Sequence, residues 1–128
     1  MKRFAPYQRH EDVRGHFLGI TQDTWSEINL VTTRSGAVRG NHFHKDTHEM
    51  FCMLSGTVTV DVEDLRTGER TTFDVNAGDL FLVEPFELHT FHARTNSTWL
   101  NFLSRPFDPA HPDFHQRTTE AVAPEETP

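Results

Sequence analysis

Three side chains that can bind a metal ion lie close together in the first half of the chain: His42, His44 and Glu49. On a strand, a spacing of two places both imidazoles on one face and Phe43 on the other. Glu49 can return to the same site from the next strand, after a short bend. Imidazole nitrogens and a carboxylate oxygen suit divalent Zn, Fe, Mn, Ni and Cu. The spacing therefore indicates a candidate metal site.

A histidine pair alone is more often a surface or core feature than a metal site. Here the pair comes with a carboxylate, with flanking glycines at Gly36 and Gly56, and with a possible fourth ligand, His89. Two further histidines lie near these residues in the sequence but are not expected to be ligands. On strands, His48 beside Glu49 and His92 three residues after His89 should face away from the site, so they are expected to be surface or supporting residues.

The segments that hold these residues resemble the two sequence motifs of the cupin superfamily. Residues 36–56 follow the first motif, which reads Gly, five residues, His-x-His, four residues, Glu, six residues and Gly. Residues 78–89 follow the second, which reads Gly, five residues, Pro-x-Gly, two residues and His. The resemblance implies an all-β fold, the double-stranded β-helix or jelly-roll barrel. It also implies one divalent metal ion on four ligands: His42, His44, Glu49 and His89.

The second motif departs from the family pattern in its turn. Glu84 and Phe86 stand where the family usually has proline and glycine, and Pro85 lies between them. The departure places the local turn geometry in question, because glycine adopts backbone conformations that Phe avoids. The histidine at the end of the motif is unaffected.

Three narrower resemblances concern sugar enzymes. Residues 12–17 (DVRGHF) and 36–42 (GAVRGNH) are similar to segments of dTDP-4-dehydrorhamnose 3,5-epimerases. Residues 39–45 (RGNHFHK) resemble the R-G-x-H-x-H-K run of nucleotide-sugar 3,4-ketoisomerases. Residues 107–113 (FDPAHPD) resemble the ending of the metal-binding cupin domain of bifunctional capsular-polysaccharide enzymes. Together they imply a metal-dependent isomerase or epimerase that acts on a sugar-like, nucleotide-sugar carbonyl substrate.

The expected chemistry differs from that of the epimerases in one respect. In that family a histidine acts as base and a tyrosine as acid. His42 matches the histidine, but Tyr7, the only tyrosine, matches no catalytic position. A metal-assisted route through an enediolate is therefore expected, with His42 and Glu49 as the candidate catalytic residues. The proton carrier stays open, since Glu27 or Glu87 could also reach the pocket.

The candidate substrate-binding residues combine cations, amides and one aromatic ring. A cation can hold an anionic group of the substrate by charge-assisted hydrogen bonds. Solvated surface charge is an alternative of at least equal weight for these cations. The candidates are Arg39, Lys45, Asn29, Phe91 and Asn101.

Two other functions remain open at this point. Three histidines and one glutamate around Fe(II) leave coordination positions for substrate and dioxygen, which is typical of a cupin dioxygenase. A cupin can also bind a small molecule without catalysis. The metal found in the purified protein and the presence of oxygen uptake would separate these alternatives.

Short strand-like runs supply the elements that must position these residues. In residues 57–63 Val alternates with Thr, Asp and Glu, as a strand with one buried face requires. Similar runs cover residues 25–33, 37–44, 80–83 and 97–103, and residues 66–69 predict a hairpin loop. A helix is expected at most as a turn or two near residues 109–116. Many short strands favour a sandwich or barrel.

Composition narrows the class of protein further. The net charge of −7 argues against a nucleic-acid partner, and the one cysteine, Cys52, excludes an intrachain disulfide. Neither a signal peptide nor a membrane span is predicted, so a cytoplasmic protein is expected. We expect a single cupin domain over residues 1–116 with an N-terminal strand arm, and a disordered acidic tail over residues 117–128. The resemblance implies a homodimer that involves residues 1–20.

Overall fold

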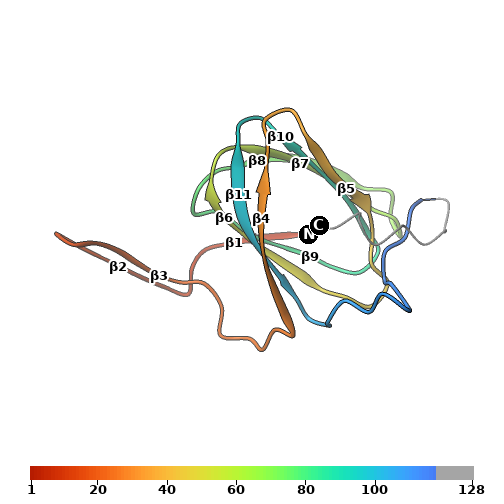
Figure 1. The fold of residues 1–128 in the computed structure, drawn as a ribbon, viewed down its shortest axis with the longest axis horizontal. Helices are drawn as coiled ribbons and strands as arrows, with labels where there is room; N and C mark the ends of the chain where they lie inside the picture. Colours follow the sequence, from red (N-terminus) through yellow and green to blue (C-terminus); the bar gives the residue numbers. More distant parts are fainter. Residues whose placement is uncertain (118–128) are drawn as a thin grey trace.

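The computed structural model describes residues 1–117, which form an all-β barrel with a projecting hairpin (Figure 1). A five-stranded sheet has the order β1-β9-β6-β11-β4, and a four-stranded sheet has the order β5-β10-β7-β8. The third sheet is the hairpin β2-β3. The strands are β1 (Lys2–Phe4), β2 (Gln8–Asp12), β3 (Gly15–Gly19), β4 (Glu27–Thr33), β5 (Val38–His42), β6 (Glu49–Ser55), β7 (Val58–Asp64), β8 (Arg70–Val75), β9 (Leu80–Val83), β10 (Glu87–Ala93) and β11 (Ser97–Leu103).

The two large sheets enclose an aromatic core. Alternation along β7 buries Val58, Val60 and Val62 and leaves the intervening side chains half-buried. From the opposite sheet, Phe51 and Trp99 complete the same core cluster. Aromatic side chains bury large apolar areas, and burial of apolar area drives folding. The predicted jelly-roll fold is confirmed.

Most predicted strands are present within two residues of their expected ends, and no helical turn forms in residues 109–116, where at most a turn or two was expected. Residues 109–116 form turns and an isolated antiparallel bridge that pairs His115 with Phe43. The chain returns to the barrel here, so the backbone of His115 pairs with Phe43, just after β5, instead of with groups of its own segment. No helix long enough to cross a membrane occurs in residues 1–117. Apart from Arg117, the predicted disordered tail lies outside the described residues.

The N-terminal segment has two parts. Strand β1 pairs with β9 and forms one edge of the five-stranded sheet. The hairpin β2-β3 projects away from the barrel (Figure 1), and all of β2 and most of β3 are exposed. The sequence had indicated a strand arm but not its hairpin form.

Candidate metal centre

The two sheets bring together the four predicted ligands. His42 on β5 lies opposite His89 on β10, because these antiparallel strands pair in that register. Glu49 begins β6 in the other sheet, and His44 lies just after β5. One ligand atom from each residue lies within 4.8 Å of the others, and all four residues are buried. The structure therefore brings the four predicted ligands together at one buried point.

A bulge next to His89 turns the end of β5 toward the barrel interior. The pairing of β5 with β10 shifts between His89 and Thr90. Gly40 has a φ of 86°, and a Cβ atom there would lie 2.8 Å from the carbonyl oxygen of His89. Asn41 also has a positive φ, of 61°, which Asn tolerates better than most residues. Glycine is required at position 40 because only glycine combines this φ with so close an approach.

Asp113 holds the loop that leads from His44 to Glu49. Its carboxylate accepts hydrogen bonds from three consecutive backbone amides, those of Lys45, Asp46 and Thr47, and from the Thr47 hydroxyl. Burial raises the pKa of the Asp113 carboxyl, but these hydrogen bonds lower it by more, so the pKa lies below its usual value. The C-terminal segment thereby fixes the shape of a ligand-bearing loop.

Backbone carbonyl groups orient two of the imidazoles in the same way. Nδ1 of His44 lies 2.6 Å from the Asp113 carbonyl oxygen, and Nδ1 of His89 lies 3.0 Å from that of Glu87. A carbonyl oxygen only accepts, so each Nδ1 carries the proton and donates. Nε2 is then the nitrogen of each ring that faces the centre, the arrangement found in histidines that bind metal ions.

The unusual turn of the second motif keeps its shape without glycine. Phe86 has a φ of 65°, the left-handed conformation that glycine adopts easily. Its amide donates to the His44 carbonyl oxygen at 2.8 Å. The ring lies 6.0 Å from that of Phe43, and the guanidinium of Arg66 lies over it at 5.3 Å. Packing on both sides stabilises the strained residue, and the turn still places His89.

The centre combines one carboxylate with neutral imidazole. Burial raises the pKa of Glu49, but His44 and His89 lower it by more, so the carboxyl stays ionised with a pKa well below its usual value. Burial and then the neighbouring imidazoles of His89 and His44 lower the pKa of His42 to about 2. Burial lowers the pKa of His44, but Glu49 raises it by more. The ionised Glu49 and the neutral His42 are in the states that a metal ion requires, whereas His44, whose pKa is raised, would release a proton when it binds the ion.

Buried nitrogen atoms without hydrogen-bond partners lie where the four side chains converge. Within residues 1–117, neither ring nitrogen of His42 makes a hydrogen bond, and Nε2 of His89 makes none. The latter atom lies 3.2 Å from Oε1 of Glu49 without hydrogen-bond geometry. Each unpaired buried nitrogen costs about 1–3 kcal/mol. A divalent ion bound at the centre would take up one nitrogen of each ring, so the residues fit such an ion.

Phe114 covers the centre from the C-terminal side. Its ring lies 4.9 Å from that of His42 and 5.2 Å from that of His44. The ring of Phe107 stacks on it at 5.4 Å. Sequence reasoning gave no role to either phenylalanine or to Asp113. The resemblance over residues 107–113 was the only signal that marked this segment.

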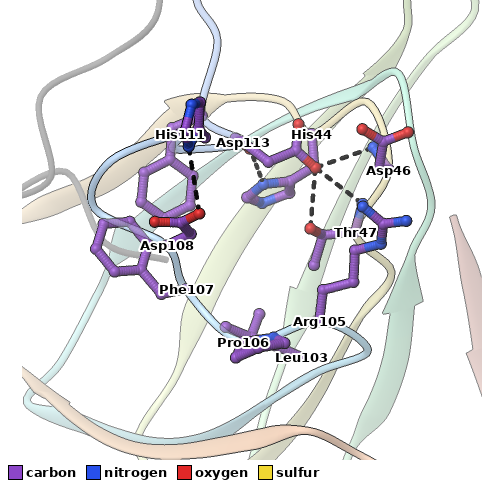
Figure 2. A pocket seen from close by; sticks show the side chains of 11 residues that line it. His44, Asp46, Thr47, Leu103, Arg105, Pro106, Phe107, Asp108, His111 and Asp113 are labelled. Atoms are coloured by element: carbon purple, nitrogen blue, oxygen red, sulfur yellow. Dashed lines mark hydrogen bonds and ion pairs between the residues drawn. The ribbon is translucent and has the colours of Figure 1, made fainter.

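Two cavities meet at Phe107 and Phe114. The first, of about 540 Å³, lies on the side of His44, and its lining includes three carboxylates and the guanidinium of Arg105 (Figure 2). The second, of about 490 Å³, lies against β4, β5 and β11. The residues that line the first cavity include Asp46, Asp108 and Asp113, and those that line the second include Glu27, Asn29, Arg39 and Asn101.

The predicted substrate-binding residues fall into three groups. Asn29, Arg39 and Asn101 line the second cavity together. Lys45 is exposed on the loop after His44. Phe91 is 3% exposed and packs in the core against Phe51 and Trp99, so it lines neither cavity. We therefore no longer assign Phe91 a contact with substrate.

Comparison with known protein families places most of the chain in one family. The model of the family described as "Polysaccharide biosynthesis C-terminal domain" matches residues 10–115. Oxalate decarboxylase OxdC of Bacillus subtilis (strain 168) is 29% identical to this chain, over 77% of this chain and 30% of that protein. The chain thus spans less than a third of the length of this relative.

Solved structures of sugar enzymes share the fold. The QdtA 3,4-ketoisomerase of Thermoanaerobacterium thermosaccharolyticum in complex with TDP matches with a TM-score of 0.74 at 19% identity, over 88% of this chain and 85% of that one. The rmlC epimerase of Mycobacterium tuberculosis matches with a TM-score of 0.76 at 21% identity, over 89% of this chain and 66% of that one. CapF of Staphylococcus aureus, a capsular polysaccharide assembling protein, matches with a TM-score of 0.67 at 21% identity, over 88% of this chain and 33% of that one. These likenesses confirm the RmlC-like cupin fold.

Proposed function

The chain belongs to the family of polysaccharide biosynthesis C-terminal domains, and from this premise we propose that it is a metal-dependent isomerase or epimerase of a sugar carbonyl compound. The observation that carries the proposal is the convergence of His42, His44, Glu49 and His89 on one buried point, with imidazole nitrogens that have no protein partner. The similarity in fold to a 3,4-ketoisomerase and an epimerase supports a nucleotide sugar as substrate class.

One divalent ion of Zn, Fe, Mn or Ni would be held by the three imidazoles and the carboxylate. When bound, such an ion supplies a Lewis acid that polarises the oxygen of a carbonyl group. The chain itself orients two ligands through the carbonyl groups of Asp113 and Glu87. It also excludes water, since all four ligands and Phe114 are buried.

Proton transfer at the carbon beside the carbonyl group requires a base at the centre. His42 is neutral, because its pKa is lowered to about 2 by burial and by its imidazole neighbours, and no protein group occupies its nitrogens. Glu49 is ionised but in contact with His44 and Asn101. Glu27 and Glu87 both accept backbone hydrogen bonds. We retain His42 and Glu49 as the candidate catalytic residues.

The second cavity suits an anionic sugar derivative better than the first. Arg39 donates from Nε to the Thr33 hydroxyl at 2.8 Å and from its Nη2 atom to the Thr32 carbonyl oxygen at 3.0 Å, which orients the guanidinium at the cavity. The carboxylates of the first cavity would repel a phosphate or carboxylate group. A cavity of about 490 Å³ is within the range of small-molecule sites. Phe114 lines this cavity and covers His42, so it must move for substrate to reach the centre.

Solvent deuterium exchange tests the proposed function. Metal-loaded protein in D2O should introduce deuterium beside the carbonyl group of a 4-keto nucleotide sugar, as followed by mass spectrometry. His42→Asn should slow exchange by at least about 100-fold. His92→Asn is the matched control, because His92 lies on the outer side of β10 and pairs with Asp61. No exchange with Zn, Fe, Mn or Ni across a panel of such sugars would remove the proposal.

The same assay locates the substrate. Arg39→Ala should raise the KM, because its guanidinium lines the second cavity, whereas Arg105→Ala should leave the KM unchanged. The reverse result would place the substrate in the first cavity. Each arginine lines a cavity that Phe107 also lines, so each variant controls for the loss of charge in the other.

A second candidate function rests on the relative named oxalate decarboxylase. A small carboxylic acid could bind to Arg39, and Fe(II) on this ligand set would leave positions for dioxygen. Iron in the purified protein with oxygen uptake on a small organic acid would favour this oxygen-dependent function. Zinc without uptake would favour the isomerase. A protein that binds sugars without exchange or uptake would be a binding module.

We also propose a homodimer to which residues 1–20 contribute. The hairpin β2-β3 exposes Phe17 and Val13 outside the barrel, and edge strand β4 exposes Ile28 and Leu30. Exposed apolar side chains beside an unpaired strand edge favour association. Light scattering of the whole chain at micromolar concentration should give the mass of a dimer, and a monomer would refute it.

A further inference from the structure

The carboxylate of Glu49 directs its two oxygens to different partners. Oε1 contacts Nε2 of His44 and of His89, on the side where the imidazoles converge. Oε2 accepts a hydrogen bond of 2.8 Å from the side-chain amide of Asn101. Both Glu49 and Asn101 are 0% exposed, so water cannot replace this bond. Asn101 therefore holds the oxygen that faces away from the centre.

Chemistry fixes the direction of each hydrogen bond beyond Glu49. An ionised carboxylate only accepts, so Asn101 must present its NH2 group to Glu49. The side-chain oxygen of Asn101 then accepts from the NH2 group of Asn29 at 3.2 Å. The same NH2 group donates to Oε2 of Glu27 at 2.9 Å. Each amide in this chain of bonds thus has a single orientation.

The chain of bonds is built on two neighbouring strands and ends at the C-terminal segment. Asn29 on β4 lies directly opposite Asn101 on β11 in the antiparallel register. At the outer end, Oε1 of Glu27 accepts a hydrogen bond of 2.9 Å from the backbone amide of Phe107. The segment that covers the centre is thereby connected to Glu49 through three side chains.

The sequence had suggested that both asparagines bind substrate. In the structure the NH2 group of Asn101 faces Glu49, and its oxygen accepts from Asn29. Asn29 uses its NH2 group for Asn101 and Glu27. Both side-chain amides therefore bond to protein groups, and the NH2 group of Asn101 bonds to Glu49, one of the four candidate ligands.

We propose that Asn101 is a positioning residue that holds Glu49 as a ligand with a single oxygen, and that Asn29 keeps Asn101 in the required orientation, a role that rests on the proposed metal centre. With Oε2 bound to Asn101, the carboxylate offers only Oε1 to the ion, beside three imidazole nitrogens. Without the Asn101 donor, Glu49 is free to rotate and to bind with both oxygens. Groups that orient ligands in this way affect metal affinity by about 10- to 100-fold.

Asn101→Asp tests the proposal directly. The substitution keeps the shape of the side chain but puts an acceptor oxygen opposite Oε2 of Glu49, where a donor is needed. The affinity for Zn²⁺, measured by competition with a chelator, should fall by about 10- to 100-fold. The visible absorption of the Co²⁺-loaded protein should weaken, because Glu49 is no longer restricted to one oxygen and the coordination number rises.

Two further variants separate positioning from folding. Asn96→Asp is the matched control, since the Asn96 side chain only accepts a hydrogen bond from the Ser35 amide, and Asp keeps that acceptor. It should change neither affinity nor spectrum. Asn29→Asp removes the donor to Asn101 at a half-buried position, and should weaken Zn²⁺ binding by up to about 10-fold. This variant provides the test if Asn101→Asp does not fold.

The outcomes distinguish this role from the proposed function. Wild-type protein that binds Zn²⁺, with Asn101→Asp and Asn29→Asp of equal affinity and unchanged Co²⁺ spectrum, overturns the positioning role and leaves the metal centre standing. Wild-type protein that binds neither ion overturns both. Weaker binding and a weaker spectrum in the two variants, with Asn96→Asp unchanged, support both.

Discussion

The loop of residues 43–48 and the turn of residues 84–87 both place ligands of the same centre, but they are held in different ways. The loop is held from a distance, because the carboxylate of Asp113 binds three of its backbone amides. The turn is held mainly by side-chain packing, with one short-range hydrogen bond. The amide of Glu84 donates to Oε1 of Glu87 at 2.7 Å, and Phe86 packs against Phe43 and Arg66.

The difference shows how one barrel can supply ligands through two kinds of support. The loop has no strained residue of its own, so its shape depends on docking of the C-terminal segment. The turn contains a phenylalanine with a positive φ, so its shape depends on packing that offsets backbone strain. Damage to the first support should reach the metal centre directly. Damage to the second should lower stability before it affects the metal.

The largest effect is expected at Asp113. Asp113→Ala removes four hydrogen bonds to residues 45–47, and should lower the free energy of unfolding of the metal-free protein by about 2–3 kcal/mol. Zn²⁺ affinity should fall as well, because the loop that joins His44 to Glu49 is no longer fixed. Denaturant unfolding and chelator competition measure the two effects.

Asp108→Ala is the control for Asp113→Ala. Asp108 lies on the same segment, but its carboxylate interacts only with exposed groups nearby: it accepts a hydrogen bond from the Ala110 amide and lies 3.5 Å from Nδ1 of His111. This variant should unfold within about 0.5 kcal/mol of wild type and bind Zn²⁺ equally well. If both variants behave alike, support of the loop from a distance is refuted.

The ligands could be predicted from the sequence because their signals are local. His42 and His44 share a strand face through their spacing, and Glu49 and His89 stand at fixed positions in two motifs. The hydrogen bonds from the amides of residues 45–47 to Asp113 give no such signal. They join residues far apart in sequence, and almost every residue carries a backbone amide. The hydrogen bond from Asn29 to Asn101 was missed for the same reason: strand pairing, not spacing, brings the two residues together.

Two other residues show the limits of a periodic pattern. His89 and Phe91 are two residues apart on β10 and are both buried, but this spacing does not say which part of the interior each one occupies. Phe91 belongs to the aromatic core, whereas His89 belongs to the centre. At Phe86 the sequence showed a departure from the motif, and the structure shows that the backbone keeps the glycine-like conformation.

Phe86 provides a test of the turn that is held by packing, with a smaller expected effect. Phe86→Ala removes the ring but keeps a Cβ atom in the left-handed conformation, and should lower the free energy of unfolding by about 2 kcal/mol. Phe86→Gly removes the ring and the strain together. It should be more stable than Phe86→Ala by about 1 kcal/mol, the cost of that conformation for a residue with a Cβ atom. Denaturant unfolding of the metal-free proteins compares the two.

The smallest effect is expected at Arg66, whose guanidinium lies over the Phe86 ring and also donates to the Pro85 carbonyl oxygen at 3.0 Å. Arg66→Ala should lower the free energy of unfolding by about 0.5–1 kcal/mol. In the Phe86→Gly background the same substitution should cost less, because only the bond to Pro85 remains to be lost. A double-mutant cycle should therefore give a coupling energy of about 0.5 kcal/mol. A coupling of zero would mean that Arg66 does not stabilise the left-handed Phe86, and the packing that offsets its strain would then have to come from Phe43 alone.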